Sequence, residues 1–450
     1  MANSMTRKIS TGAVCTILIS VFAALAAQAQ QRETDNQIRF FQWKVAQDPD
    51  DQFNYDRLGV AYIQKARETG DVTYYNLAAT SLEKSLALES KAPEAAPPAK
   101  HLATVYYAEH RFTEALALAQ KALVLNPRDN TPYALIGDAE SEMGDYDKAW
   151  TSYARLSDPQ DRQSTLSGMQ YLAQSRESVK SFLTGDSKAA IEHMRSAVQL
   201  SVDARMPMES IAWSQFSLGE ACLQVGDLAG ARAAYSESLK TYPEYHRALA
   251  GLAKVSAAEG KLQDAIELYK RAIAVIPLPA YAAALGDVYA KAGNSAEAKK
   301  QYDLVEYIAR LNAFNQSVYN RELAVFYADH DVNLPQALTL ARKEFEIRHD
   351  IYTWDALAWA LDKNGQSAQA ATAMKDALHL DTQDPLILFH AGMIYQHLGE
   401  NAKAEEYLHR AIALNPQFHL FYAEVAKATL RDLSKASLAA ADHRTADAQP

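Results

Sequence analysis

The chain has 450 residues, of which 48% are hydrophobic and 22% charged, and it contains 17 glycines, 15 prolines and two cysteines. The hydrophobic fraction is that of a folded protein, and two cysteines exclude a disulfide scaffold or a cysteine-rich metal site. The net charge of -10 argues against nucleic acid as the main partner, and the low glycine and proline content favours helix over sheet.

Residues 1–29 have the order of a secretory signal peptide. Arg7 and Lys8 precede an apolar run, 13–27, which ends in the small-x-small sequence Ala27-Gln28-Ala29. We therefore expect export to the periplasm or out of the cell, with cleavage after Ala29. Cleavage removes two positive charges and shifts the net charge from -10 to -12. An uncleaved membrane anchor is the alternative, although a span needs roughly 20 apolar residues and this run is shorter.

From Asp51 onward, one pattern of small, aromatic and turn residues recurs about every 34 residues. Counted from an anchor at Gly219, it places Gly226 at +7, Ala231 at +12, Tyr235 at +16 and Pro243 at +24. Each unit contains two apolar stripes of helical period, separated at position +7. The anchors are Gly59, Ala103, Gly137, Ser178, Gly219, Ala253, Gly286, Ala324, Ala358 and Gly392.

The spacing predicts pairs of antiparallel helices that stack on one another. Small residues at the anchor and at +12 let the two helices approach closely, and the aromatic residue at +16 fills the gap to the next pair. Proline at +24 ends the second helix because it lacks an N–H and clashes with the preceding turn. A single pair cannot bury both of its faces, so neighbouring pairs must stack, and one elongated domain can contain the whole chain.

Three segments carry a family resemblance: Leu58-Gly59-x2-Tyr62, Leu285-Gly286-x2-Tyr289 and Trp354-x2-Leu357-Ala358-x2-Leu361. They are similar to the first-helix motif W-x2-L-G-x2-Y of the tetratricopeptide repeat family, and the resemblance extends over roughly 51–433. It implies an all-α fold, a right-handed α-solenoid of about ten helix-turn-helix repeats. It also implies a concave surface lined by the first helix of each pair, where ligands bind.

The departures from the period suggest how the array is bounded and modified. We expect a lead-in helix over 30–50, the repeat array over 51–416, a capping helix over 417–433 and a disordered tail over 434–450. The wide first interval places an insertion near 66–76, between the helices of the first repeat. The weak pattern around Ser178 predicts an irregular repeat near 165–205, after a polar loop over 157–164. In the repeat anchored at Gly286, apolar residues up to Phe314 predict a second helix that is longer by about a turn.

The sequence contains no phosphate-binding glycine loop, nucleophile elbow, zinc-protease motif or calcium loop, and we predict no catalytic residue, cofactor or metal. His390 and His397 are two helical turns apart and could form a metal site with His409. Solvent-facing histidines are the simpler interpretation. Cys222, the only cysteine after cleavage, lies at a helix-packing position, where a small apolar side chain suits the core; a reactive thiol is the alternative.

Candidate groove residues leave the packing stripe at three before the anchor, one after it and four after it, and three more, Tyr352, Leu386 and Trp213, would enter from the helix starts. Aromatic and methionine side chains at such positions are typical of adaptable recognition surfaces. Burial by neighbouring helices is the alternative interpretation. The predicted groove residues are Tyr352, Asp355, Trp359, Asp362, Leu386, Phe389, Met393 and Gln396 near the C-terminus, and Trp213 and Phe216 in the middle of the array.

The function expected from these features is that of an exported, non-enzymatic scaffold or adaptor that binds a protein or an extended or helical peptide in its groove. Lys100, Arg247 and Lys254 lack the asparagines of the clamp by which some family members hold chaperone tails. We expect a bacterial periplasmic or envelope complex, no nucleic acid and no membrane span after signal cleavage. The alternative is an accessory subunit, or a divergent enzyme, of a polysaccharide, peptidoglycan or proteolytic machine of the cell envelope.

Overall fold

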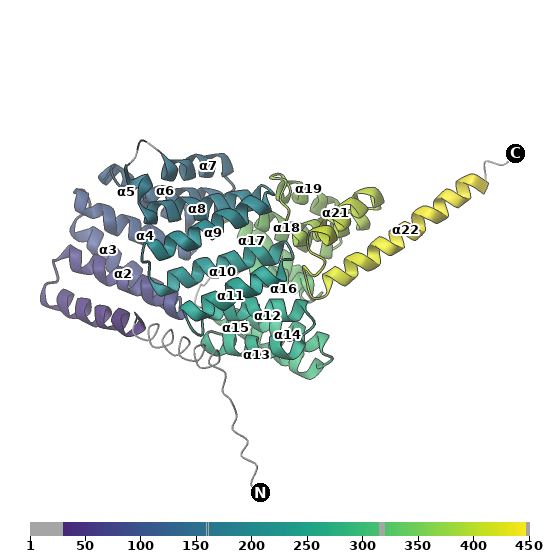
Figure 1. The fold of residues 1–450 in the computed structure, drawn as a ribbon, viewed down its shortest axis with the longest axis horizontal. Helices are drawn as coiled ribbons and strands as arrows, with labels where there is room; N and C mark the ends of the chain where they lie inside the picture. The colour runs from purple at the N-terminus through teal and green to yellow at the C-terminus, as the bar shows by residue number, and fades with distance from the viewer. Residues whose placement is uncertain (1–29, 159, 161, 315–319, 447–450) are drawn as a thin grey trace, which may run out of the picture.

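The computed structural model describes residues 30–158, 160, 162–314 and 320–446, so the predicted signal peptide lies outside the described part. The described residues form helices joined by short turns, without a strand (Figure 1). The helices stack in antiparallel pairs along the chain, which confirms the predicted all-α solenoid. A helix over residues 30–47 precedes the pairs.

The described chain contains ten helix pairs, followed by a long last helix. The pairs are α2 (Gln52–Thr69) with α3 (Thr73–Leu88), α4 (Ala96–Ala108) with α5 (Phe112–Leu125), α6 (Pro132–Glu142) with α7 (Tyr146–Ala154), α8 (Ser167–Leu183) with α9 (Ser187–Asp203), α10 (Met208–Gln224) with α11 (Leu228–Thr241), α12 (His246–Ala258) with α13 (Leu262–Val275), α14 (Pro279–Lys291) with α15 (Ser295–Phe314), α16 (Asn320–Asp329) with α17 (Leu334–Phe345), α18 (Ile351–Lys363) with α19 (Ser367–Ala377), and α20 (Pro385–His397) with α21 (Asn401–Leu414). Short 3₁₀ turns are η1 (Pro93–Ala95), η2 (Arg155–Ser157) and η3 (Arg162–Thr165), and the last helix is α22 (Tyr422–Ala446).

The anchor glycines are the points of closest approach between helices. A Cβ added to Gly219 in α10 would lie 2.5 Å from the ring of Tyr235 in α11, and a Cβ on Gly251 in α12 would also lie 2.5 Å from that ring. Tyr235 is fully buried between the two. The aromatic residue at +16 therefore packs against its own pair and against the next one, as the spacing predicts.

The turn within a pair needs a left-handed residue at +7. Gly226 occupies this position with a φ of 75°, which costs glycine little because it has no Cβ. In the second and eighth pairs the same position holds His110, with a φ of 60°, and Asp331, with a φ of 54°. These two turns therefore carry a side chain at the left-handed position, where the other pairs have glycine.

The wide first interval comes from longer helices and not from an inserted loop between them. The predicted insertion near 66–76 is corrected in this respect, because α2 continues to Thr69 and α3 begins at Thr73. The last turn of α2 has a packing function that explains its length. Glu68 is buried there and accepts hydrogen bonds from Gln30 and Thr34, each 2.9 Å long, which dock the N-terminal helix onto the first pair.

The repeat near 165–205 is a regular pair despite its weak sequence pattern. Helices α8 and α9 have 17 residues each and pack along their length. The hydroxyl of Ser178 replaces the glycine contact by donating to the carbonyl of Ala190, at 2.8 Å. The polar stretch before this pair contains η2 and η3. The predicted lengthening up to Phe314 is present in α15, which has 20 residues.

The C-terminal part differs from the prediction at both boundaries. Residues 415–421 form an irregular connection, and α22 begins at Tyr422 and continues to Ala446, through most of the segment predicted to be disordered. Alanine-rich sequence has high helix propensity, which explains the continuation. The first turns of α22 cap the array through buried Ala426, Leu430 and Leu433, and its remainder extends away from the body (Figure 1).

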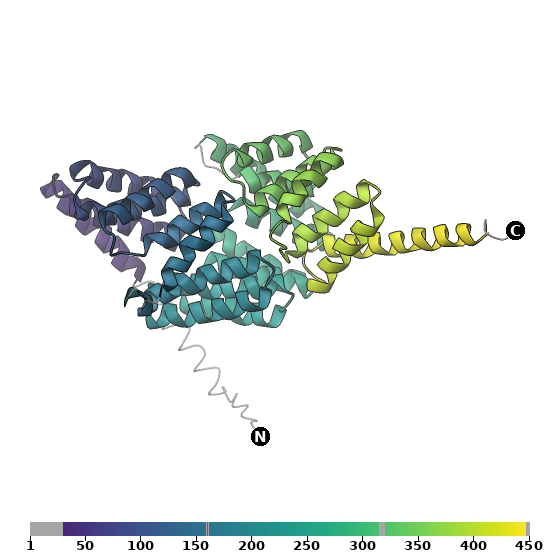
Figure 2. The ribbon, with the colours of Figure 1, turned by 90° about the horizontal axis from the view of Figure 1, so that it is seen from above.

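Successive turns of the superhelix touch each other. Figure 2 shows the N-terminal pairs and the later pairs coming together after the path has curved round. Each contact joins the turn within one pair to the loop that follows a pair five places later. The close approaches are Gly70 to Ile276, Gly144 to His349, Gly185 to Asp381 and Gly226 to Asn415.

Candidate functional site: the inner face and its polar networks

The structure buries the central residues of the predicted C-terminal groove. Trp359 and Phe389 are 3% and 1% exposed and belong to the core of the last pairs. The indole N–H of Trp359 donates to Asp329 at 2.8 Å. These two aromatic residues are therefore not exposed, and Asp355 and Asp362 are also buried.

The other predicted groove residues lie closer to the surface. Tyr352, Leu386 and Met393 are partly buried against the same core, and Gln396 is partly exposed. Trp213 and Phe216 belong to a different place, on α10. Trp213 is 36% exposed, and Phe216 packs partly buried beside Tyr235 with a centroid separation of 5.8 Å. The structure therefore divides the predicted set into two regions.

The two histidines of the considered metal site each pair with a different carboxylate. His390 Nδ1 lies 2.9 Å from Asp355, and His397 Nδ1 lies 2.8 Å from Asp362. Burial lowers the pKa of His390, but Asp355 outweighs it, so the pKa is raised; the hydrogen bond to Asp362 raises the pKa of His397. His409, on α21, belongs to neither pair. Among the described residues, no three His, Cys, Asp or Glu side chains are grouped to hold a metal ion.

An acid, a tyrosine and a base recur at equivalent positions of the array. In the seventh pair, the hydroxyl of Tyr302 donates to Asp287 at 2.9 Å. His330 from the next pair lies 2.8 Å from the same carboxylate through Nε2. Burial lowers the pKa of His330, but its bond to Asp287 outweighs burial and raises the pKa. One carboxylate thus connects both helices of its own pair to the following pair.

The same triad occurs in the third and fifth pairs. Its acid follows the anchor glycine directly, and its tyrosine lies 15 residues later in all three cases. Because the period places the acid and the tyrosine opposite each other, this signal was visible in the sequence, and our prediction missed it. The other two triads are Asp138, Tyr153 and Arg176, and Glu220, Tyr235 and Lys254.

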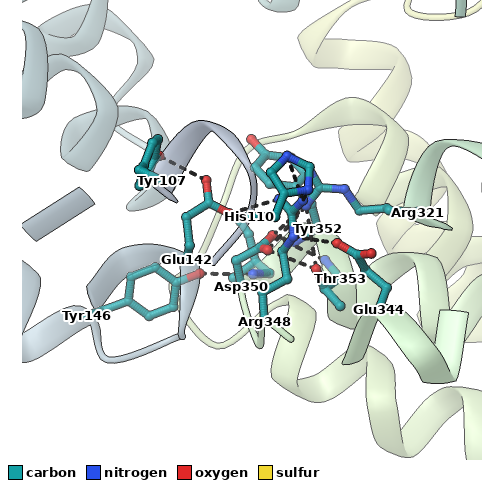
Figure 3. A network of polar contacts seen from close by, with 11 residues as sticks. Tyr107, His110, Glu142, Tyr146, Arg321, Glu344, Arg348, Asp350, Tyr352 and Thr353 are labelled. Atoms are coloured by element: carbon teal, nitrogen blue, oxygen red, sulfur yellow. Dashed lines mark hydrogen bonds and ion pairs between the residues drawn. The ribbon is translucent and has the colours of Figure 1, made fainter. Parts of the chain in front are cut away.

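A buried guanidinium joins the superhelical turns (Figure 3). Arg348 is 3% exposed and lies in the loop after α17. Its Nε donates to Glu344 at 2.5 Å and its Nη1 to Glu142, at the end of α6, at 2.9 Å. Its Nη2 lies 3.0 Å from Nδ1 of His110, the left-handed residue of the second pair. Burial, and then Arg348, lower the pKa of His110 to about 3, so the ring is neutral and accepts the hydrogen bond.

A second set of bonds reinforces this contact (Figure 3). Asp350 caps α18 by accepting from the backbone N–H of Tyr352 at 2.8 Å, and Arg321 donates to the same carboxylate at 3.1 Å. The backbone N–H of Ile351 donates to the hydroxyl of Tyr146, in the third pair, at 2.9 Å. Buried charges with this many partners fix the relative positions of pairs distant in sequence.

Two surface hollows lie away from the predicted groove. They have volumes of about 570 and 510 Å³ and occur around the connection between α7 and α8, and neither is lined by a predicted groove residue. No helix in the described residues is both long enough and apolar enough to cross a bilayer.

Two segments of the array match a known family. The tetratricopeptide repeat models match residues 216–282 and 385–418. No curated protein matches the sequence. Yeast Tom70 is 13% identical over 94% of this chain and 99% of its own, with a TM-score of 0.41. The Cut9–Hcn1 hetero-tetramer of APC/C matches at 16% identity over 94% and 99%, with a TM-score of 0.33.

The pilus biogenesis factor PilW is 19% identical, covering 48% of this chain and 92% of its own, with a TM-score of 0.36. These scores are low, so the assignment rests on the matched segments and on the helix pairs with which they coincide. On these grounds residues 216–282 and 385–418 are tetratricopeptide repeats, and the other helix pairs of the described chain have the same arrangement.

Proposed function

We propose that the protein is an exported, non-catalytic scaffold that binds a peptide segment of a partner protein on the inner face of the repeat array. Tetratricopeptide repeats support a protein–protein interaction role in general. The observation that carries the specific proposal is Trp213, a large aromatic residue left 36% exposed on a first helix beside the partly exposed Phe216. Aromatic side chains of this kind are the usual anchors of protein interfaces.

The test for binding uses a photo-crosslinking residue in place of Trp213, introduced in the native cell. We expect a discrete adduct with a partner protein. The control carries the same residue at Val124, which is 79% exposed on α5, a second helix. Equal crosslinking from both positions, or none from Trp213, contradicts binding on the inner face.

Export is proposed on the charge and hydrophobicity of residues 1–29. Fractionation of a bacterial host expressing the full chain, followed by N-terminal sequencing, tests it. We expect a periplasmic or secreted protein that begins at Gln30. A full-length chain in the membrane fraction supports the retained anchor, and a full-length chain in the cytoplasm contradicts export.

A further inference from the structure

A later segment of the chain itself contacts the first helices of the last pairs. The C-terminal segment, residues 415–424, runs from the end of α21 into the first turn of α22 and contacts first helices from the fifth to the tenth pair. Asn415 donates to the carbonyl of Leu223 in α10 at 2.8 Å. Leu420 packs against the core of α12 to α15, and Glu424 lies 3.2 Å from Lys291 in α14.

Two aromatic residues four positions apart anchor the segment. Tyr422 stacks on Phe389 of α20 with a centroid separation of 4.5 Å and an angle of 19° between the rings, and Phe418 lies 5.7 Å from the same ring. The hydroxyl of Tyr422 donates to Asp329 at 2.8 Å, beside the indole N–H of Trp359. This arrangement also explains why Trp359 and Phe389 are buried: the predicted groove is filled.

The segment is attached through side chains, and its backbone bonds are local. The N–H of Phe418 donates to the carbonyl of Asn415, and the N–H groups of Phe421 and Tyr422 donate to the ring of His419. Residues 418–422 all keep part of their surface exposed. A segment held by two aromatic anchors, one hydroxyl and one ion pair presents the same contacts that a separate peptide would make.

The charges around the segment set the chemistry of an alternative occupant. Asp329 accepts hydrogen bonds from the hydroxyl of Tyr422 and the indole of Trp359, so a second acidic side chain beside this carboxylate, between the two aromatic anchors, is disfavoured. Lys291, beside Phe421 and Glu424, favours one acidic residue just after the second anchor.

We propose that residues 415–424 are an internal ligand, and that the same site binds a partner peptide with two aromatic residues four apart, the second a tyrosine followed two positions later by an acid. This rests on the proposed function and adds its regulation. The partner peptide and the internal segment compete, so the partner binds when the segment is released.

The probe is a fluorescent synthetic peptide with the sequence of residues 414–426, titrated into the full chain. The tethered segment competes at a high effective concentration, so we expect weak binding to the parent protein. Phe418→Ala with Tyr422→Ala in the chain weakens the competitor without changing Phe389, Trp359 or Asp329. We expect about ten-fold tighter binding of the probe to this variant. A probe with the same two alanines is the matched control and should not bind.

A second variant keeps the test informative where the double variant unfolds. Lys291→Ala removes the ion pair to Glu424, and the lysine side chain is 29% exposed, so the fold should persist. The probe for this variant is the same peptide with alanine in place of the residue equivalent to Glu424. We expect it to bind Lys291→Ala more tightly than it binds the parent, by a smaller factor than for the double variant. The proposal is overturned if neither folded variant binds the probe more tightly than the parent does. It is also overturned if the only change in both variants is the formation of dimers in which two chains exchange residues 415–424. If the photo-crosslinking residue at Trp213 gives an adduct but the probe does not bind, the scaffold function stands and only the internal ligand is rejected.

Discussion

Two buried histidines on first helices show that the partner, more than burial, decides the charge of the ring. His246 is 3% exposed and its Nδ1 lies 2.7 Å from the hydroxyl of Tyr281. Burial lowers its pKa to about 3. His390 is buried even more completely, yet Asp355 raises its pKa. A neutral hydroxyl cannot compensate the desolvation of a charged ring, whereas a carboxylate can.

Acid should therefore destabilise the fold through His246. The unfolded chain binds a proton at this residue below pH 6.5, while the folded chain does not bind it until about pH 3. The free energy of unfolding should fall by about 1.4 kcal/mol per pH unit from this group as the pH decreases below 6.5. Urea denaturation at pH 7 and pH 5 measures the fall, and His246→Gln should reduce it. A variant with the same pH slope as the parent contradicts the assignment.

At the scale of the element, the helix pairs depend on one small residue and one aromatic residue in contact. Gly219 and Gly251 enclose the ring of Tyr235, and the rings of Tyr153 and Tyr302 approach Gly137 and Gly286 in the same way. Because a Cβ has no room at these positions, glycine here is a packing requirement within the helix, against its low helix propensity.

Gly219→Ala should cost about 1–3 kcal/mol, since the added methyl overlaps the buried ring of Tyr235. Gly168→Ala is the matched control, because Gly168 is at the start of α8 and has no atom within 4 Å of the added Cβ. It should be neutral or stabilising through helix propensity, by up to about 1 kcal/mol. Chemical denaturation of the two variants compares them directly. An equal change in both variants would show that the contact with Tyr235 does not control the position.

The period predicted the number of pairs and their packing because both depend on contacts within one or two repeats. It failed for the groove because a position off the packing stripe looks the same whether solvent or a distant segment covers it. Trp359 and Phe389 are covered by residues 418–422, most of which belong to an irregular connection that has no periodic signature. The pairing of His110 with Arg348 spans 238 residues and could not be read from a repeat of 34.

For the whole molecule, the closure between superhelical turns depends on a few buried charges. Arg348 joins Glu344, which is 1% exposed, to Glu142 and His110 in pairs far away in sequence. Burial raises the pKa of Glu142, and the positive charge of Arg348 opposes this shift. Removing one member of such a set leaves a buried charge without compensation.

Arg348→Met should lower the free energy of unfolding by about 3–5 kcal/mol. It should also increase the radius of gyration in small-angle X-ray scattering, because the superhelical turns separate. Arg232→Met is the control: Arg232 pairs with Glu259 on the surface, where an ion pair contributes about 1 kcal/mol or less. A compact Arg348→Met protein with the stability of the control would show that the turns are held by other contacts.

The contacts between superhelical turns also change how the array responds to force. A solenoid in which each repeat touches only its neighbours stretches as a soft spring, by small changes at every junction. Here the superhelical turns contact each other where Gly70, Gly144, Gly185 and Gly226 approach loops five pairs away, so extension must first break these contacts. The protein should resist pulling up to a threshold and then yield in one step. A partner that inserts between the superhelical turns would lower this threshold force, so the force at which the protein yields would report whether the partner is bound.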